Sequence, residues 1–163
     1  MAMVAFYQLV DKSHALDETR SLVLGEGHVL PPDGYAFMEF YCDDPRCDCR
    51  RVIFQVWRRS TGSKVWATIT YGWEPAAYYA TWSKSPSLAY TDEMSGAQLD
   101  PICPQSELSV GILGMAKELL LSDPSYVDRL KRHYREACPR RGRVARESTS
   151  WKARQRMRRR RKG

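Results

Sequence analysis

The run Tyr35-Ala36-Phe37-Met38-Glu39-Phe40-Tyr41-Cys42 is the clearest strand signal in this chain of 163 residues. Alternate side chains of a β-strand share a face, and this run alternates in that way. One face would carry Ala36, Met38, Phe40 and Cys42, and the other Tyr35, Phe37, Glu39 and Tyr41. The run therefore predicts a β-strand.

Two further alternating runs follow, Arg51 to Arg59 and Lys64 to Trp73. The residues between them, Ser60-Thr61-Gly62-Ser63, are small and polar and include a glycine, which suits a hairpin turn. The three runs therefore predict an antiparallel meander. The segment Thr19 to Leu24, rich in valine and leucine, is expected to add another strand before it.

Three helices are expected after the strands, at Glu74 to Trp82, at Ser106 to Leu121 with Ser106 as the N-cap, and from Asp123-Pro124 to Pro139. Apolar residues recur at helical spacing in the second and third. Residues Ser83 to Gln105 resemble a long surface connection. Strands followed by helices predict a small α+β domain, an antiparallel sheet covered on one face by C-terminal helices.

The positive charge is concentrated at the C-terminal end. The chain has 26 basic and 19 acidic residues, a net charge of +7. Residues 139–163 hold twelve of the bases and one acid, so they carry +11 and the remaining residues carry −4. We therefore expect one folded domain over residues 1–138 and a disordered basic tail over residues 139–163.

Membrane and secreted classes are not expected. The apolar runs are far shorter than the ~20 residues that a spanning helix needs. Met1 to Val10 lacks the basic segment and the small-residue cleavage site of a secretory signal. The sequence therefore predicts a cytoplasmic protein without a membrane span.

Three cysteines, Cys42, Cys47 and Cys49, form a C-x4-C-x-C run in the loop between two predicted strands. Converging thiolates repel one another, and Zn2+ offsets that repulsion by accepting several sulfur ligands. We therefore predict a structural metal site, with zinc as the metal. Three alternatives stay open: an iron–sulfur cluster with Cys103 as its fourth ligand, a Cys42–Cys47 disulfide, and thiols that merely pack in the core.

A closed zinc site needs a fourth ligand. The preferred candidate is His133, which shares the inward stripe of the last helix with Leu130. The first alternative is Cys103, and the others are Cys138, His28, a carboxylate of Asp43, Asp44 or Asp48, or water. A core histidine hydrogen-bonded to the backbone is the competing interpretation of His133.

Three segments together resemble an uncharacterised family of small bacterial proteins. They are Cys42 to Val52, Tyr71-Gly72-Trp73-Glu74 with Tyr79 and Trp82, and Leu130-Lys131-Arg132-His133-Tyr134. The resemblance covers about Glu18 to Arg135 and leaves the basic tail outside. It implies a metal-binding domain with these limits, and it implies no activity.

The basic tail predicts contact with a polyanion. Eight of the last twelve residues are Lys or Arg, a density that can replace the counterions of a phosphate backbone. RNA is favoured over DNA, because disordered Arg-rich segments often order on RNA. The predicted contacts are Arg154, Arg156, Arg158, Arg159, Arg160, Arg161 and Lys162, with Trp151 as a stacking partner. A solubilising extension without a partner is the alternative.

The five aromatic residues Tyr71, Trp73, Tyr78, Tyr79 and Trp82 are expected to pack in the core rather than to stack on bases. The sequence contains no phosphate-binding loop, no H-E-x-x-H and no G-x-S-x-G motif, so we favour a non-enzymatic binding domain. The alternatives are a metal-dependent enzyme with a site near the cysteine loop and Glu74, and a protein-interaction adaptor. The other acidic residues, Glu39 among them, are expected to be solvated or to support the metal site.

Overall fold

A computed structural model describes residues 3–83 and 93–139 of the chain. Its strands are β1 (Met3–Ala5), β2 (Ser21–Leu24), β3 (Asp33–Cys42), β4 (Arg51–Arg58), β5 (Val65–Gly72) and β6 (Gly96–Leu99). Its helices are α1 (Phe6–Leu9), α2 (Lys12–Glu18), α3 (Ala76–Ser83), α5 (Ser109–Leu119) and α6 (Pro124–Ala137), and a 3-10 turn η1 spans Arg59–Thr61. The α+β class is thus confirmed.

The sheet is antiparallel, with β3, β4 and β5 side by side as the sequence predicts. The long strand β3 has β4 on one side, whereas β2 pairs with its first half and β1 with its last residues. The η1 turn joins β4 to β5 where the hairpin is expected. The end of β3 therefore lies in the middle of the sheet, next to the start of β4.

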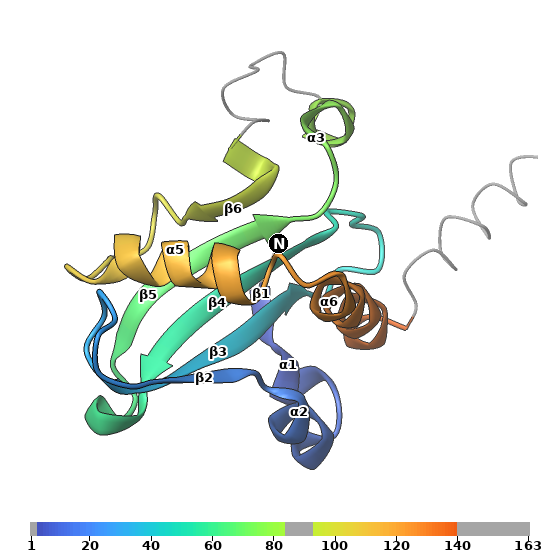
Figure 1. Cartoon of the computed structure of the whole chain (residues 1–163). Coiled ribbons are helices and arrows are strands. Elements are labelled where there is room, and N and C mark those ends of the chain that lie inside the picture. Colours follow the sequence, from blue (N-terminus) through green and yellow to red (C-terminus); the bar gives the residue numbers. More distant parts are fainter. Residues whose placement is uncertain (1–2, 84–92, 140–163) are drawn as a thin grey trace, which may run out of the picture.

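Helices α5 and α6 cover one face of this sheet (Figure 1). Helix α5 lies against β5 and β6, and α6 lies against β3 and β4. The strand face beneath them is fully buried at Phe37, Val52 and Ile69, and Ile112 and Leu130 of the helices are equally buried. Apolar burial between the helices and this face is the main stabilisation of the fold.

The caps of the two C-terminal helices differ from each other. Asp123 caps α6 as predicted, because its carboxylate accepts a hydrogen bond from the Ser125 N–H at 2.9 Å, and Pro124 occupies the first turn. Helix α5 begins two residues later than predicted, with Leu108 rather than Ser106 at the N-cap position. The Ser106 hydroxyl accepts a hydrogen bond from the Leu108 N–H at 3.2 Å and donates one to the Trp66 carbonyl oxygen at 2.5 Å. Ser106 therefore anchors the preceding loop to β5.

The structure contains two groups of elements that the sequence does not predict. Strand β6 pairs with β5 inside the segment that we expected to be a surface connection, of which residues 84–92 lie outside the described part. The N-terminal β1, α1 and α2 were not predicted either, and α1 packs against α6. None of the helices in the described ranges combines the length and the apolarity that a bilayer crossing requires. The basic tail from Arg140 onward lies outside those ranges.

Gly72 at the end of β5 sits in a closely packed corner. A Cβ atom there would lie 2.8 Å from Tyr79 Cζ, and closer still to the Tyr79 hydroxyl and the Met94 carbonyl oxygen. Tyr79 is fully buried, so it has no free space into which to move. Glycine is therefore required where Tyr79 of α3 packs against the end of β5.

We expect Gly72→Ala to destabilise the protein by about 1 to 3 kcal/mol, because the methyl group overpacks this corner. The matched control is Gly114→Ala in α5, where nothing lies within 4 Å of the added Cβ. Alanine is the better helix former, so the control should gain up to about 1 kcal/mol. Urea unfolding of both variants measures the difference, and equal stabilities would contradict the packing argument.

Candidate metal centre

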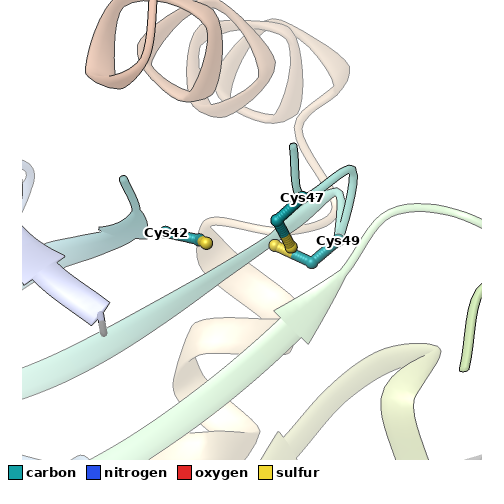
Figure 2. Close-up of side chains that lie close together, drawn as sticks. All are labelled: Cys42, Cys47 and Cys49. Carbon is teal, nitrogen blue, oxygen red and sulfur yellow. The ribbon is translucent and has the colours of Figure 1, made fainter. Parts of the chain in front are cut away.

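The three cysteines meet where β3 ends. Cys42 is the last residue of β3, and Cys47 and Cys49 lie in the cysteine loop, residues 43–50, that leads to β4. The three sulfur atoms all lie within 4.8 Å of one another, and all three residues are buried. Figure 2 shows the three side chains pointing toward one another. We call this group the cysteine cluster.

The loop turns because of local hydrogen bonds around Pro45. The Asp44 carboxylate accepts from the Arg46 N–H at 2.8 Å, and the Asp44 carbonyl oxygen accepts from the Cys47 N–H at 3.1 Å. Arg50 then takes a φ of 46°, a left-handed conformation that is rare for a residue with a side chain. The turn brings Cys47 back toward Cys42, and Arg50 directs the chain into β4.

Tyrosines from two helices hold the second half of the loop. The Tyr78 hydroxyl donates to the Asp48 carbonyl oxygen at 2.5 Å, and the Tyr79 hydroxyl donates to the Arg50 carbonyl oxygen at 2.9 Å. From α6, the Tyr134 hydroxyl accepts from the Arg50 N–H at 3.1 Å. These contacts satisfy backbone groups that the loop leaves without partners, so they support its conformation. Tyr79 is buried, whereas Tyr78 remains partly exposed.

The cluster fits a metal ion of the zinc type. Four sulfur ligands at ~2.3 Å around a tetrahedral ion lie ~3.8 Å from one another, so the observed separations need to contract by about 1 Å or less. Burial raises the pKa of the Cys47 thiol, and the neighbouring Cys49 and Cys42 raise it further. Several thiolates at this point therefore require a cation to balance them. The cluster can therefore hold a metal ion.

His133 differs from our expectation, because the structure does not bring it to the cysteine cluster. Its Nδ1 lies 2.6 Å from Glu39 Oε2, and its Nε2 bonds to Glu18. The side chain is 1% exposed, and its ring stacks on Phe6 at 4.3 Å between centroids. Both ring nitrogens are occupied by carboxylates, so His133 serves as the partner of two acids in this structure rather than as a sulfur-site ligand.

The other two cysteines that could be the fourth ligand differ in their position relative to the cysteine loop. In the described part of the chain the metal-competent group consists of the three cluster cysteines alone. Cys103 lies in the loop after β6, with its N–H bonded to the Asp100 carboxylate. Cys138 is buried at the end of α6, and its Sγ lies 3.4 Å from the carbonyl oxygen of Asp43, the residue that follows Cys42. Of the cysteines outside the cluster, Cys138 is the one that contacts the cysteine loop.

The acids around His133 form a network that we did not predict. Glu39 was expected to be solvated or to support the metal, but it is 5% exposed and accepts a hydrogen bond from the Tyr41 hydroxyl at 2.7 Å. Arg132 donates to Glu18 at 2.6 Å. One signal was present in the sequence: Glu39 shares a strand face with Phe37 and Tyr41, and an acid on a core face needs a buried partner.

The network stabilises the charged form of His133. Burial lowers its pKa, but the hydrogen bonds and charges of Glu39 and Glu18 outweigh burial and raise that pKa above the ordinary 6.5. For the acid Glu18 burial acts in the opposite direction and raises the pKa. Arg132 and His133 outweigh burial and lower the pKa of Glu18 to about 2. The imidazolium therefore joins α6 to β3 and to the end of α2.

The predicted nucleic-acid contacts, Trp151, Arg154, Arg156, Arg158, Arg159, Arg160, Arg161 and Lys162, lie outside the described residues. Searches against models of protein families, against curated proteins and against solved structures found no match. The resemblance to a family of small bacterial proteins therefore stays a prediction, and the argument for function depends on this chain's own residues.

We expect His133→Gln to lower the free energy of unfolding by about 3 kcal/mol at pH 6, because it removes the charged partner of buried Glu39. The effect should depend on pH. Because its pKa is raised in the folded state, His133 contributes fully to the free energy of unfolding below pH 6.5. That contribution is lost as the pH rises through the pKa of the folded state. The lowered pKa of Glu18 makes its contribution complete above pH 4.5 and removes it toward about pH 2.

Urea unfolding from pH 5 to pH 9 measures this prediction as the difference between the wild-type protein and the variant. The control is His28→Gln, because His28 is exposed. A loss at His133 no larger than the loss at His28, or a difference that does not shrink with rising pH, would show that the imidazolium does not stabilise the fold.

Proposed function

We propose that this protein is a zinc-stabilised binding domain that contacts nucleic acid, with RNA preferred, through its basic tail. The single observation that supports the zinc site is the convergence of three buried cysteine sulfurs within 4.8 Å. Thiolate ligands favour zinc among the common divalent metals of cells. The metal would hold the cysteine loop closed between β3 and β4.

We propose Cys138 as the fourth ligand, although its sulfur lies outside the group of three that converge in this structure. It is buried, it contacts the backbone beside Cys42, and it lines the same cleft as Cys47. His133, the ligand that the sequence favours, has both ring nitrogens bonded to carboxylates. A ligand at Cys138 would complete four sulfurs and tie the end of α6 to the loop. Such a closed site stabilises structure and leaves no open position for a substrate.

The arrangement of the acids near the cluster also favours binding over catalysis. Asp48 of the cysteine loop and the nearby Glu74 are acids of the kind that a metal-dependent enzyme would require, but Arg50 forms ion pairs with both at 3.0 Å. Burial raises the pKa of Asp48, and the hydrogen bonds and charge of Arg50 outweigh it, so the net pKa is lowered. An acid held ionised by an arginine is a weak general base.

The nucleic-acid part of the proposal is supported by the distribution of charge. The tail carries +11 and the rest of the chain −4, so attraction to phosphates is concentrated in 25 residues. Affinity that arises from counterion release decreases steeply with salt and tolerates many sequences. Membrane contact is disfavoured, since the tail has no apolar face to accompany its charges.

We expect the purified full chain to contain one zinc ion, measured by elemental analysis. Cys47→Ser should lose the metal, and Cys103→Ser, a matched removal of a thiol elsewhere, should keep it. Cys138→Ser should weaken zinc binding by more than the ~10- to 100-fold that a lost supporting contact costs. His133→Gln should retain the full zinc content.

The same measurements contain the outcomes that contradict the metal proposal. Iron in place of zinc would contradict the zinc site and favour the iron–sulfur alternative. A metal-free protein from zinc-replete medium would refute the metal proposal. Full zinc affinity in Cys138→Ser would exclude Cys138 as the fourth ligand. Loss of zinc in Cys103→Ser would instead identify Cys103 as a ligand, which is the first alternative that the sequence offers.

We expect the full chain to bind a fluorescein-labelled, single-stranded 20-nucleotide RNA with an affinity that decreases at least ~300-fold between 50 mM and 200 mM salt, as 6 to 10 phosphate contacts with a single strand require. A chain that ends at Pro139 should lose nearly all of this binding while its zinc content and circular dichroism stay unchanged. Fluorescence anisotropy makes the measurement. Affinity that is insensitive to salt, or that survives the truncation, would refute the role of the tail.

A further inference from the structure

A cleft of about 670 Å³ opens between the cysteine loop and the second half of α6. Its walls include Arg46 and Cys47 of the loop, Trp73 just after β5, and Lys131 and Arg135 of α6. The volume lies within the ~300–1,000 Å³ range of sites that hold a small molecule or one unit of a polymer. Cys47 and Cys138, two ligands of the proposed zinc site, lie in its wall, and the rest of the lining takes no part in that site.

The charges along the cleft favour an anion. Arg46, Arg50, Lys131 and Arg135 line it together with two carboxylates, Asp48 and Glu74, a net charge of +2. Arg50 already bonds to both carboxylates. The other three cations are available: Arg46 and Lys131 make only long contacts of 3.5 Å with neighbouring acids, and Arg135 forms no ion pair within the described ranges.

Trp73 adds an aromatic surface to this cationic cleft. Its ring is only partly buried, and it packs edge to face on Tyr134 at 5.2 Å between centroids. Tyr134 is itself buried, and its hydroxyl accepts a hydrogen bond from the Arg50 N–H. Trp73 and Tyr134 thus line the cleft together, and their contact supports the position of the indole. An indole placed among cations is a surface on which a nucleobase stacks.

We propose that this cleft binds an unpaired nucleotide of a single-stranded nucleic acid, with its base stacked on Trp73 and its phosphates on Arg46, Lys131 and Arg135. The proposal rests on the nucleic-acid binding proposed above and names the folded part of that interface. Pro139 lines the cleft, and the basic residues begin at Arg140, the next residue of the sequence. The tail thus follows the cleft directly in the sequence, and it would contribute affinity without selecting unpaired bases.

Base stacking makes the proposal distinct from binding by charge alone. A stacked base contributes ~1 to 3 kcal/mol, which corresponds to roughly 5- to 150-fold in affinity. A base inside a duplex cannot stack on Trp73 unless it is extruded, and extrusion has a free-energy cost. The cleft therefore predicts preference for a single strand over a duplex, and that preference should depend on Trp73.

The test uses the full chain and three probes: labelled 12-nucleotide oligouridylate, an RNA duplex of the same length, and heparin, a polyanion without bases. Trp73→Leu should weaken binding of the single strand roughly tenfold and leave binding of heparin unchanged. The double variant Lys131→Gln, Arg135→Gln should reduce the salt dependence by about two counterions. The control Lys117→Gln, Arg59→Gln removes two charges from exposed sites outside the cleft and should keep the selectivity and show a smaller loss.

Each outcome decides one question. If the single strand binds Trp73→Leu and the double cleft variant as tightly as wild type while truncation at Pro139 abolishes binding, the cleft proposal is overturned and the tail proposal stands. An equal loss for heparin and the single strand in Trp73→Leu also overturns the cleft proposal. If the wild-type chain binds none of the probes, the proposed function itself fails. Zinc content and thermal midpoints identify a misfolded variant. If Trp73→Leu misfolds, the double variant Lys131→Gln, Arg135→Gln provides the test.

Discussion

The buried contact between His133 and Glu39 fixes where α6 lies on the sheet. An imidazolium whose two nitrogens face carboxylates allows little rotation of the helix, because any turn about its axis would leave a buried charge without its partner. Leu130 on the same stripe supplies apolar contact with the sheet but no directional constraint. The helix is therefore oriented by polar geometry and held down by apolar packing.

That orientation determines what the rest of α6 contacts. Tyr134, one residue after the buried histidine, meets the backbone of Arg50 and supports Trp73. Lys131 and Arg135 lie on the side that lines the cleft, and Cys138 ends the helix beside the carbonyl oxygen of Asp43. One helix thus joins the core, the cysteine loop and the cleft, and the candidate zinc site and the candidate nucleotide site share a single support.

The strands and the cysteine cluster could be predicted because their signals are local. Alternation identifies β3, β4 and β5, and three cysteines within eight residues can converge through a single turn of the chain. The role of His133 could not be predicted in this way, since helical spacing shows that it faces inward but does not show which residue it meets. Strand β6 has a sequence, Gly-Ala-Gln-Leu, without β-branched or aromatic residues, so its pairing depends on the tertiary contact with β5.

The position of the cysteine cluster indicates what a metal would do in this fold. The apolar core that the sheet, α5 and α6 share includes Cys47 and Cys49 of the loop, but most of its members belong to the strands and helices, so metal loss need not unfold the domain. The conformation of the loop is less stable than the core, because Arg50 adopts a left-handed conformation and three thiols are buried together. Arg46 and Cys47 are at once loop residues and walls of the cleft. A metal bound at the cluster would therefore act chiefly on the shape of the cleft, linking the metal to binding rather than to folding alone.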